Sequence, residues 1–372
     1  MTLGSLFDGV GGFPLAASRV GIFPVWASEI VEDCISITKR HFPFMRHLGD
    51  ITKINGADIE PVDIISFGSP CQDLSISGKR AGLNGEKSGL FLQAVRVIKE
   101  MRIATNRKYP ATIIWENVPG AFSSHKGKDF QKVLQEVACI AEAGISIPRP
   151  SAKSRWMAAG GIVGDCFSLA WRVFNAEYWG VPQRRRRIFL IANFGNQCAG
   201  EILFKPESET RNIKEGKEEG DSFAGKTDNG VKQYVVNIGY STDRIYMNPQ
   251  TTVTLRANSG GCGANTGLYC LPVKQNNVPF VCNGFGNYEH GNISKTILSR
   301  DDITSGDLIV TGYSVRRLMP IECERLQGFP DGWTQYGHNG KKISDNQRYR
   351  ALGNSLAIPC VEFVLRQIIN NS

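Results

Sequence analysis

A cysteine and a carboxyl group follow two apolar runs of this 372-residue chain. The run 64–67 has the composition of a buried strand, and a Gly-Ser-Pro turn places Cys71 directly behind it. The run 111–118 carries Glu116 and Asn117 in the equivalent place. Because ligands bind at the carboxyl ends of strands in open α/β sheets, we expect the thiol and the carboxyl group to lie side by side at that edge.

A thiol beside a carboxylic acid suits methylation of cytosine at carbon 5. That carbon is a poor nucleophile, but a thiolate that adds to carbon 6 converts the ring into an enamine, which can attack a methyl donor. A carboxyl group hydrogen-bonded to ring nitrogen 3 and the exocyclic amine would stabilise the electron-rich adduct. Cys71 or Glu116 alone would not indicate this reaction, because a lone cysteine is more simply explained as a buried structural residue.

A glycine-rich turn follows the first apolar run, within residues 3–12, and a helix is expected to start near Pro14. Glycines there let the backbone approach a ligand and aim a helix amino terminus at it. Glu29 ends the next apolar strand, where a carboxylate usually binds ribose hydroxyls. A further short strand is expected to end at a purine contact. The residues predicted for this nucleoside-binding site are Gly9, Gly11, Gly12, Glu29, Asp50 and Ile51.

Composition favours a polyanionic partner without proving one. The formal net charge is +8. The 10 cysteines include no Cys-x-x-Cys pair and no accompanying histidine cluster at zinc-ligand spacing, so we expect free thiols in a reducing cytosol and no metal. The first core strand begins almost at Met1, which leaves no room for a signal peptide, and no apolar run approaches membrane-spanning length.

Residues between Cys71 and residue 90 are rich in Gly, Ser and Lys, which suggests a basic lid or a plain flexible loop. Helices are expected at 90–101 and 129–143, with an exposed excursion at 148–165 that looks like an insertion.

Four consecutive arginines interrupt the stretch 170–194, which otherwise reads as two strands around a basic hinge. Because side chains alternate along a strand, Arg185 and Arg187 should lie on one face and Arg184 and Arg186 on the other. One pair can therefore enter the site.

The second half of the chain changes character. Residues 201–230 read as a linker, and 235–310 contain a weak internal repeat of β-like, turn-rich copies. A helix should begin after Pro320. Gly353, Asn354 and Ser355 are expected to form a turn and cap before an apolar final helix, which would pack back on the first domain and add this turn to the cofactor pocket.

The blocks FDGVGG, SPCQ, ENV, QRRRR and GNS, in this order, resemble the DNA cytosine-5 methyltransferases over nearly the whole chain outside about 195–312. The resemblance implies an α/β fold, with a Rossmann-like S-adenosylmethionine-dependent methyltransferase sheet and a smaller, mostly β target-recognition domain. The catalytic domain would span 1–194, completed by the C-terminal helix 345–372, and the recognition domain 195–344.

The resemblance also assigns roles. Cys71 would be the nucleophile and Glu116 would engage cytosine nitrogen 3, with Asn117 shaping the same loop and Arg185 and Arg187 supporting the flipped base and the catalytic loop. S-adenosylmethionine would be bound, without a metal, by Phe7, Gly9, Gly11, Gly12, Glu29, Asp50, Ile51, Pro70, Leu90, Asn354 and Ser355.

The implied substrate is a flipped cytosine in double-stranded DNA, because carbon 6 is attacked from a ring face that stacking hides. The variable segment would read the sequence in the major groove. The repeated hairpins would then form either one composite reader or two alternative ones. The expected setting is a monomeric enzyme in the cytoplasm, prokaryotic or phage-encoded, with a possible cognate restriction endonuclease.

Four rival interpretations remain. An RNA (tRNA) cytosine-5 methyltransferase would share the chemistry, although the long variable segment favours duplex DNA. A catalytically inactive DNA-binding relative would not need Cys71 and Glu116. A nicotinamide dehydrogenase would explain Glu29 but would leave the arginines without a role. A methylase acting on an exocyclic amine would need an Asp-Pro-Pro-Tyr type motif, which this chain lacks.

Overall fold

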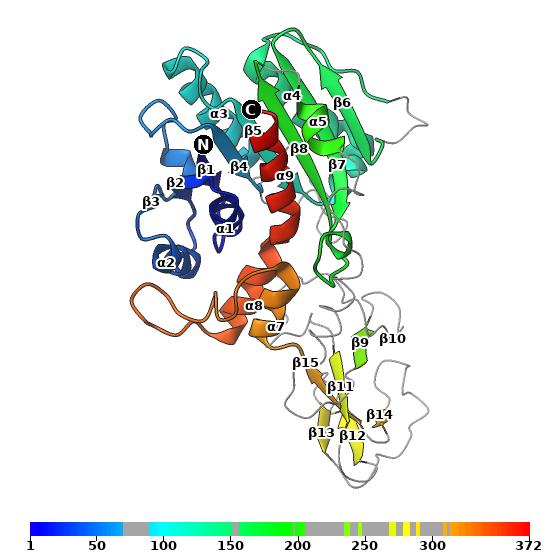
Figure 1. Ribbon diagram of the computed structural model, residues 1–372. Helices are drawn as coiled ribbons and strands as arrows, with labels where there is room; N and C mark the ends of the chain where they lie inside the picture. Colours follow the sequence, from blue (N-terminus) through cyan, green and yellow to red (C-terminus); the bar gives the residue numbers. More distant parts are fainter. Residues whose placement is uncertain are drawn as a thin grey trace.

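The computed structural model describes residues 1–69, 89–150, 156–195, 198–204 and 318–372, and between 205 and 317 only the strands named below (Figure 1). A twisted eight-stranded sheet forms the centre of these residues. From one edge to the other its strands are β3 (Arg46–His47), β2 (Phe23–Ser28), β1 (Thr2–Leu6), β4 (Ile64–Phe67), β5 (Thr112–Asn117), β8 (Arg186–Phe194), β7 (Phe167–Asn175) and β6 (Ala159–Val163).

The sheet divides into two halves by strand direction. The pairs from β3 to β5 are parallel, whereas β8, β7 and β6 run antiparallel to their neighbours. Residues 64–67 and 112–115 pair in register, so the two apolar runs of the sequence are adjacent strands whose carboxyl ends meet. The predictions of these strands and of their shared edge are confirmed.

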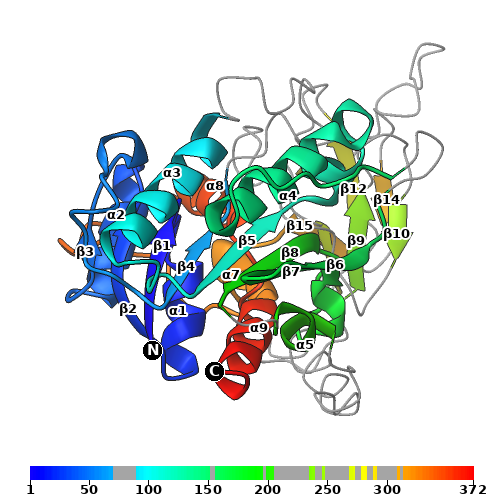
Figure 2. The same ribbon diagram turned by 90° about the horizontal axis from the view of Figure 1, so that it is seen from above.

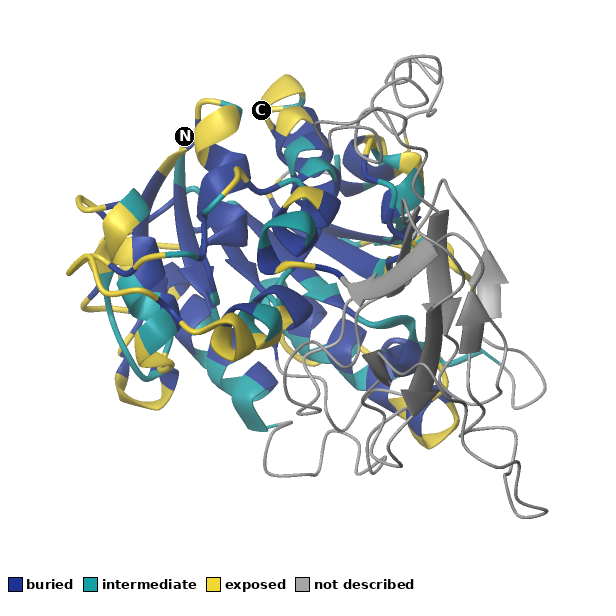
Figure 3. Ribbon diagram, turned by 90° about the horizontal axis from the view of Figure 1, so that it is seen from below, coloured by how far each residue is buried: buried dark blue, intermediate teal, exposed yellow. Residues whose placement is uncertain are grey.

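Helices cover both faces of the sheet, which explains why its central strands are apolar on both sides (Figure 2). Helices α1 (Gly12–Arg19), α5 (Ala199–Phe204) and α9 (Ile358–Asn370) lie on one face. Helices α3 (Gly89–Ala104) and α4 (Lys128–Ala141) lie on the other. The buried residues in Figure 3 gather where these helices meet the sheet.

The two ends of the chain meet, as expected. Helix α9 packs against α1, and the hydroxyl of Ser372 lies 3.8 Å from the sulfur of Met1. Among the described residues no single helix is long and apolar enough to cross a membrane. Helices α8 (Asp345–Asn354) and α9, bent by 40°, pass that test of length and composition only as a pair.

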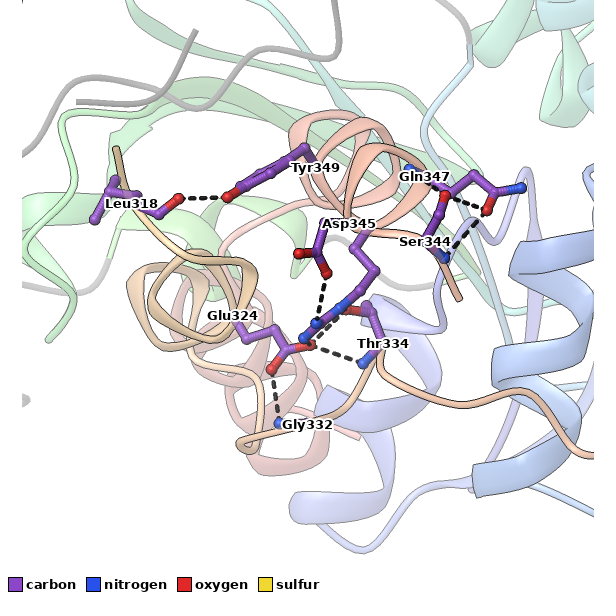
Figure 4. A network of polar contacts seen from close by, with 9 residues as sticks. Leu318, Glu324, Gly332, Thr334, Ser344, Asp345, Gln347 and Tyr349 are labelled. Carbon is purple, nitrogen blue, oxygen red and sulfur yellow. Dashed lines mark hydrogen bonds and ion pairs between the residues drawn. The ribbon is translucent and has the colours of Figure 1, made fainter. Parts of the chain in front are cut away.

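A buried polar network fixes the segment that leads into the final helices (Figure 4). Glu324 of α7 (Pro320–Gln327) is fully buried and accepts hydrogen bonds from the backbone amides of Gly332 and Thr334, at 2.7 and 2.8 Å. Arg348 of α8 forms an ion pair with Glu324 at 3.1 Å. The carbonyl of Leu318, two residues before α7, accepts from the hydroxyl of Tyr349 at 2.5 Å, so the segment that enters α7 is tied to α8 as well.

The strands between 234 and 317 form two further sheets. Strands β9 (Tyr234–Ile238), β10 (Ile245–Met247), β11 (Leu268–Pro272) and β15 (Tyr313–Arg317) form one, in the order β10-β9-β11-β15. Strands β12 (Val278–Cys282), β13 (Tyr288–His290) and β14 (Leu308–Val310) form the other. The described residues between 235 and 310 are strands, as expected, and the strands that fall in the two predicted copies belong to different sheets.

Four local expectations are wrong. The strand expected to end at residues 50 and 51 ends at His47, and residues 159–163 of the supposed excursion form the edge strand β6. Residues 201–204 of the supposed linker belong to α5, whose Ile202 and Leu203 are buried. Asn354 ends helix α8 and does not cap α9, which begins after Ala357.

Candidate active site

The glycine-rich turn after β1 bends back on itself through left-handed backbone. Phe7, Gly9 and Gly11 have φ of 55°, 60° and 82°, and α1 starts at Gly12. Only glycine adopts this region without cost, so Phe7 is held there by the structure around it. A methyl group on Gly9 would meet no described atom within 4 Å, which leaves open space beside the turn.

Glu29 lies directly after β2 and is fixed by three backbone N–H donors. Gly9 donates to its Oε2 at 2.8 Å, and Ile30 and Val31 donate to its Oε1 at 2.8 and 2.9 Å. The carboxylate therefore bridges the glycine turn and the start of α2 (Glu32–His41). The glycine turn and Glu29, which their spacing in the sequence assigned to one site, are therefore in direct contact.

The turn between α8 and α9 closes on the same place. A Cβ added to Gly12 would lie 3.1 Å from the side chain of Leu356 and 3.4 Å from Oγ of Ser355. Trp333 adds a second link, because its indole N–H donates to the carbonyl of Val10 at 2.8 Å. The expectation that the C-terminal segment returns to the glycine turn is met.

Asp50 and Leu90 approach this edge from two other segments. Asp50 caps a 3₁₀ helix, Ile51–Lys53, by accepting from the amide of Thr52 at 2.9 Å, and this hydrogen bond lowers the pKa of the exposed carboxyl. The hydroxyl of Ser28 holds the preceding carbonyl of Gly49 at 2.7 Å, which ties this segment to the end of β2. Ile51 is buried, and Leu90 is half-buried in the first turn of α3.

Glu116 forms the second centre of the site. Its Oε1 lies 3.0 Å from Nε of Arg187, and its side chain is 13% exposed. Burial raises the pKa of this carboxyl, while Arg187 and then Arg185 oppose the rise. A Cβ on Gly68 would lie 3.3 Å from Oε2 of Glu116, so the end of β4 passes directly beside the carboxyl group.

Asn117 joins the ends of β4 and β5. Its amide nitrogen reaches Oγ of Ser69 at 3.4 Å, and its Oδ1 accepts from the amide of Val118 at 2.8 Å. The indole N–H of Trp115 also donates to Oγ of Ser69, at 3.2 Å. Pro70 and Cys71 lie outside the described residues, but Ser69, the last described residue before them, is held by hydrogen bonds from Trp115 and Asn117.

The arginines alternate as predicted, because Arg185 is buried while Arg184 and Arg186 are exposed. Arg185 is 2% exposed and donates to the carbonyl of Gly353 at 3.3 Å and to that of Ser355. It thus ties the strand that carries Arg187 to the turn beside Gly12. The predicted site residues thus form two groups. The glycine turn, Glu29 and Ser355 form the first, and Glu116 and Arg187 form the second. Arg185 connects them, because it lies two residues before Arg187 in sequence and donates to the carbonyl of Ser355.

Two buried polar side chains escaped the sequence analysis. Asp8, inside the glycine turn, is 6% exposed and accepts from the hydroxyl of Ser5 at 2.7 Å, and burial raises its pKa to about 8. Gln183 is fully buried, and its amide group has no hydrogen-bond partner among the described residues. Gln183 could have been predicted, because it lies two residues before Arg185 and so shares its face in the period-two alternation of the arginine run. The sequence holds no comparable signal for Asp8.

Most of the sequence matches a known protein family. Residues 1–141 and 160–370 match the family described as C-5 cytosine-specific DNA methylase. The chain belongs to this family. Its fold class, a mixed α/β S-adenosylmethionine-dependent methyltransferase fold, is confirmed with it.

Individual relatives extend over most of the chain. It is similar to Type II methyltransferase M.HhaI of Haemophilus parahaemolyticus, with 25% identity over 98% of this chain and 92% of the relative. It is also 26% identical to a protein named DNA N-6-adenine-methyltransferase of Escherichia phage P1, over 97% of this chain but only 60% of that longer protein. The crystal structure of S. pombe Dnmt2 methyltransferase shares the fold, with a TM-score of 0.57 at 16% identity over 100% of this chain and 98% of that chain.

The donors at the glycine turn fit the cofactor that the family implies. A carboxylate fixed by three amides, left-handed glycines and open space beside Gly9 are what a ribose and its neighbouring groups need. Within the described ranges no three His, Cys, Asp or Glu side chains gather in a way that could hold a metal ion.

Proposed function

We propose that this chain transfers a methyl group from S-adenosylmethionine to carbon 5 of cytosine in a short duplex DNA sequence, through a covalent bond between Cys71 and carbon 6. The observation that carries the proposal is the pairing of Glu116 with Arg187 beside Gly68, which precedes Cys71 by three positions in the sequence. A buried acid next to a nucleophile is what this addition needs, and family membership supplies the reaction class.

Glu116 would act on the base. Burial favours its neutral form, which can donate a hydrogen bond to cytosine nitrogen 3 and stabilise the electron pair that addition at carbon 6 delivers to the ring. Arg187 restrains the same carboxyl group and limits the rise of its pKa. These opposing effects of burial and Arg187 would let the Glu116 carboxyl group both hold a proton and release it.

Cys71 would act as the nucleophile. Its thiolate would form a bond to carbon 6, and carbon 5 of the resulting enamine would then take the methyl group that a bound sulfonium supplies, with a neutral thioether as the leaving group. Loss of the proton from carbon 5 to a base and departure of the thiolate would restore the aromatic ring. A duplex base must leave its stack before this can happen, so base flipping is part of the proposal.

The cofactor would supply the methyl group as a sulfonium. Its ribose would be held by Glu29, its adenine by Asp50 and Ile51, and the remainder by Phe7 with Gly9, Gly11 and Gly12 of the turn and by Pro70, Leu90, Asn354 and Ser355. Support comes from the three amides on Glu29 and from the contact of the Ser355 turn with Gly12. The proposal includes no metal.

Residues 195–344 would read the DNA sequence, with residues 1–194 and 345–372 as the catalytic domain. The two separate sheets, β10-β9-β11-β15 and β13-β12-β14, support either one composite reader or two alternative readers. Deletion of residues 280–310 tests the second form. Loss of one target with retention of another would support two readers, whereas loss of all methylation together would count against them.

Expression in a host whose DNA lacks cytosine methylation, followed by bisulfite sequencing, tests the reaction. Methylcytosine at one or a few short motifs is expected, and Cys71→Ser and Glu116→Gln should abolish it. Cys166→Ser is the matched control, because Cys166 is an exposed free thiol, and should leave methylation intact. DNA that stays unmethylated while transfer RNA gains methylcytosine would identify the RNA enzyme, and no methylation of either would favour the inactive relative.

The proposed setting is that of a monomer acting on double-stranded DNA in a prokaryotic cytoplasm, encoded by the cell or a phage, with a possible cognate restriction endonuclease. Affinity for DNA should fall steeply with salt, because phosphate contacts by a chain of net charge +8 release counterions. The phage P1 relative is named for methylation of the adenine amine, so the same DNA should also be assayed for N6-methyladenine.

A further inference from the structure

The connection between β5 and α4 presents basic side chains that the proposed reaction does not use. After Asn117 ends β5, the chain passes through two short 3₁₀ helices, Pro119–Phe122 and Ser124–Gly127, and then enters α4. Lys126 and Lys128 lie at the end of this connection, and both are exposed. Neither lysine forms an ion pair with an acidic side chain of the described residues. Their positive charge therefore faces solvent.

The acid that follows Lys128 is turned inward. Asp129 accepts a hydrogen bond from the hydroxyl of Ser124, and its Oδ2 lies 2.9 Å from Nδ1 of His125. Its side chain is only 8% exposed. Asp129 thus stabilises the connection itself and leaves the two lysines as a positively charged surface.

The backbone of this connection has a conformation that side chains rarely adopt. His125, Lys126 and Gly127 are left-handed, with φ of 44°, 58° and 83°. Residues other than glycine keep this conformation only where surrounding contacts enforce it. Here Arg149 donates to the carbonyl of Lys126 at 3.1 Å, and the indole N–H of Trp156 donates to the carbonyl of Gly127 at 2.8 Å. These two side chains hold the connection in place.

Both side chains come from residues 142–159, which lie outside the two parts of the chain that match the family. This segment is anchored to the core, because the ring of Trp156 packs edge to face on Phe130 and Trp171, with centroids 5.2 and 5.9 Å apart. Arg149 also brings a third positive charge beside the lysines. The basic surface is therefore supported by a part of this chain that the family match does not include.

The surface lies close to the proposed active site. Lys126 follows Asn117 by nine positions. At about 2 Å per residue in 3₁₀ turns, this connection spans about 20 Å. One turn of a DNA duplex is about 34 Å long. A duplex that delivers a cytosine to Glu116 would thus carry backbone phosphates past this surface within one helical turn.

We propose that Lys126, Lys128 and Arg149 bind backbone phosphates of the DNA duplex beside the flipped cytosine. This inference rests on the proposed action on duplex DNA, in which residues 195–344 read the sequence. Ammonium and guanidinium groups bind phosphate oxygens whatever the base, so contacts of this kind fix the position of the duplex without selecting a sequence. The surface adds affinity for DNA and no specificity.

The salt dependence of DNA binding tests the proposal. Fluorescence anisotropy with a labelled duplex of arbitrary sequence, in the presence of S-adenosylhomocysteine, gives the affinity at each salt concentration. Each phosphate contact contributes about 0.9 to the slope of log affinity against log salt. Between about 50 and 200 mM salt, the affinity of wild type should therefore fall about tenfold more than that of Lys126→Gln/Lys128→Gln. Equal slopes would overturn the proposal.

Arg107→Gln/Lys108→Gln is the matched control. It removes the same charge from two exposed residues in the connection that precedes β5, at the opposite end of that strand. Arg107 is also left-handed, with φ of 65°, so the control matches the backbone conformation as well. It should keep the wild-type slope. A loss of slope equal to that of Lys126→Gln/Lys128→Gln would mean that net charge alone acts, and would overturn the proposal.

Two outcomes separate this inference from the function on which it rests. Absence of any duplex binding by the wild-type chain would contradict the proposed function itself. Duplex binding with the wild-type slope retained in Lys126→Gln/Lys128→Gln would contradict only the phosphate surface.

Discussion

Nε of Arg187 lies 3.0 Å from Oε1 of Glu116, and this contact joins strand β8 to strand β5 across the antiparallel step of the sheet. Both side chains are more than four-fifths buried, at 16% and 13% exposure, so solvent screens their interaction little. The guanidinium lowers a carboxyl pKa that burial raises. The proton affinity of the proposed catalytic acid is therefore set by two opposing effects that mutation can separate.

Arg187→Gln should move the alkaline limb of the pH–rate profile to higher pH. Removal of the cation leaves burial unopposed at that contact, so the pKa of Glu116 rises further and its neutral form persists to higher pH. Single-turnover methyl transfer measured from pH 6 to 9.5 checks this. Arg186→Gln, the exposed neighbour, is the control and should leave the limb in place. A shift to lower pH would contradict the assignment.

Arg348→Met should lower the free energy of unfolding by about 3–5 kcal/mol, because it leaves the fully buried Glu324 without its counterion. The matched control is Arg325→Met on the same helix as Glu324. Its partner, Asp331, is 51% exposed, so the expected loss is about 0–1 kcal/mol. Chemical denaturation of both variants measures the difference, and equal losses would show that Glu324 does not depend on its ion pair.

The strand ends could be predicted from sequence because an apolar run and a breaking turn are local features. Glu116 and Asn117 end β5 as their run indicated, and the alternation of the arginines followed from strand geometry. The partner of Arg185 could not be predicted. It is main chain at Ser355, distant in sequence, and the contact depends on how α8 and α9 return to the sheet.

Asp8 was missed for a related reason. It follows Phe7, whose backbone is left-handed with φ of 55°, and a phenylalanine gives no sign of that conformation. The edge strand β6 was also missed, because a sheet edge buries only part of its side chains and its exposed alternate residues resemble a loop. Predictions thus held for elements defined by local pattern and failed where tertiary contacts decide.

Arg185→Lys should weaken cofactor binding by about tenfold while leaving the transfer rate at saturating cofactor within a few-fold. Nη2 of the guanidinium donates to two main-chain carbonyls, those of Gly353 and Ser355, next to Gly12, and lysine has neither the length nor the planar group that places this nitrogen there. Titration of S-adenosylhomocysteine and single-turnover kinetics give the two numbers. Arg184→Lys, at an exposed position, is the control. Unchanged affinity with a collapsed rate would instead place Arg185 on the base.

Asp8→Asn should flatten the pH dependence of stability between about pH 4 and pH 8. The folded chain holds the Asp8 proton with a pKa of about 8, far above the ordinary aspartate value of 3.8, so it binds more protons than the unfolded chain in this window. Stability from this group is thus present below the lower value and is lost as pH rises to about 8, by at most about 1.4 kcal/mol per pH unit. Asparagine has no proton to lose. Denaturation at pH 5, 6, 7 and 8 should therefore show the variant gaining on the wild type as pH increases, and parallel curves would mean that Asp8 is already ionised in the free protein.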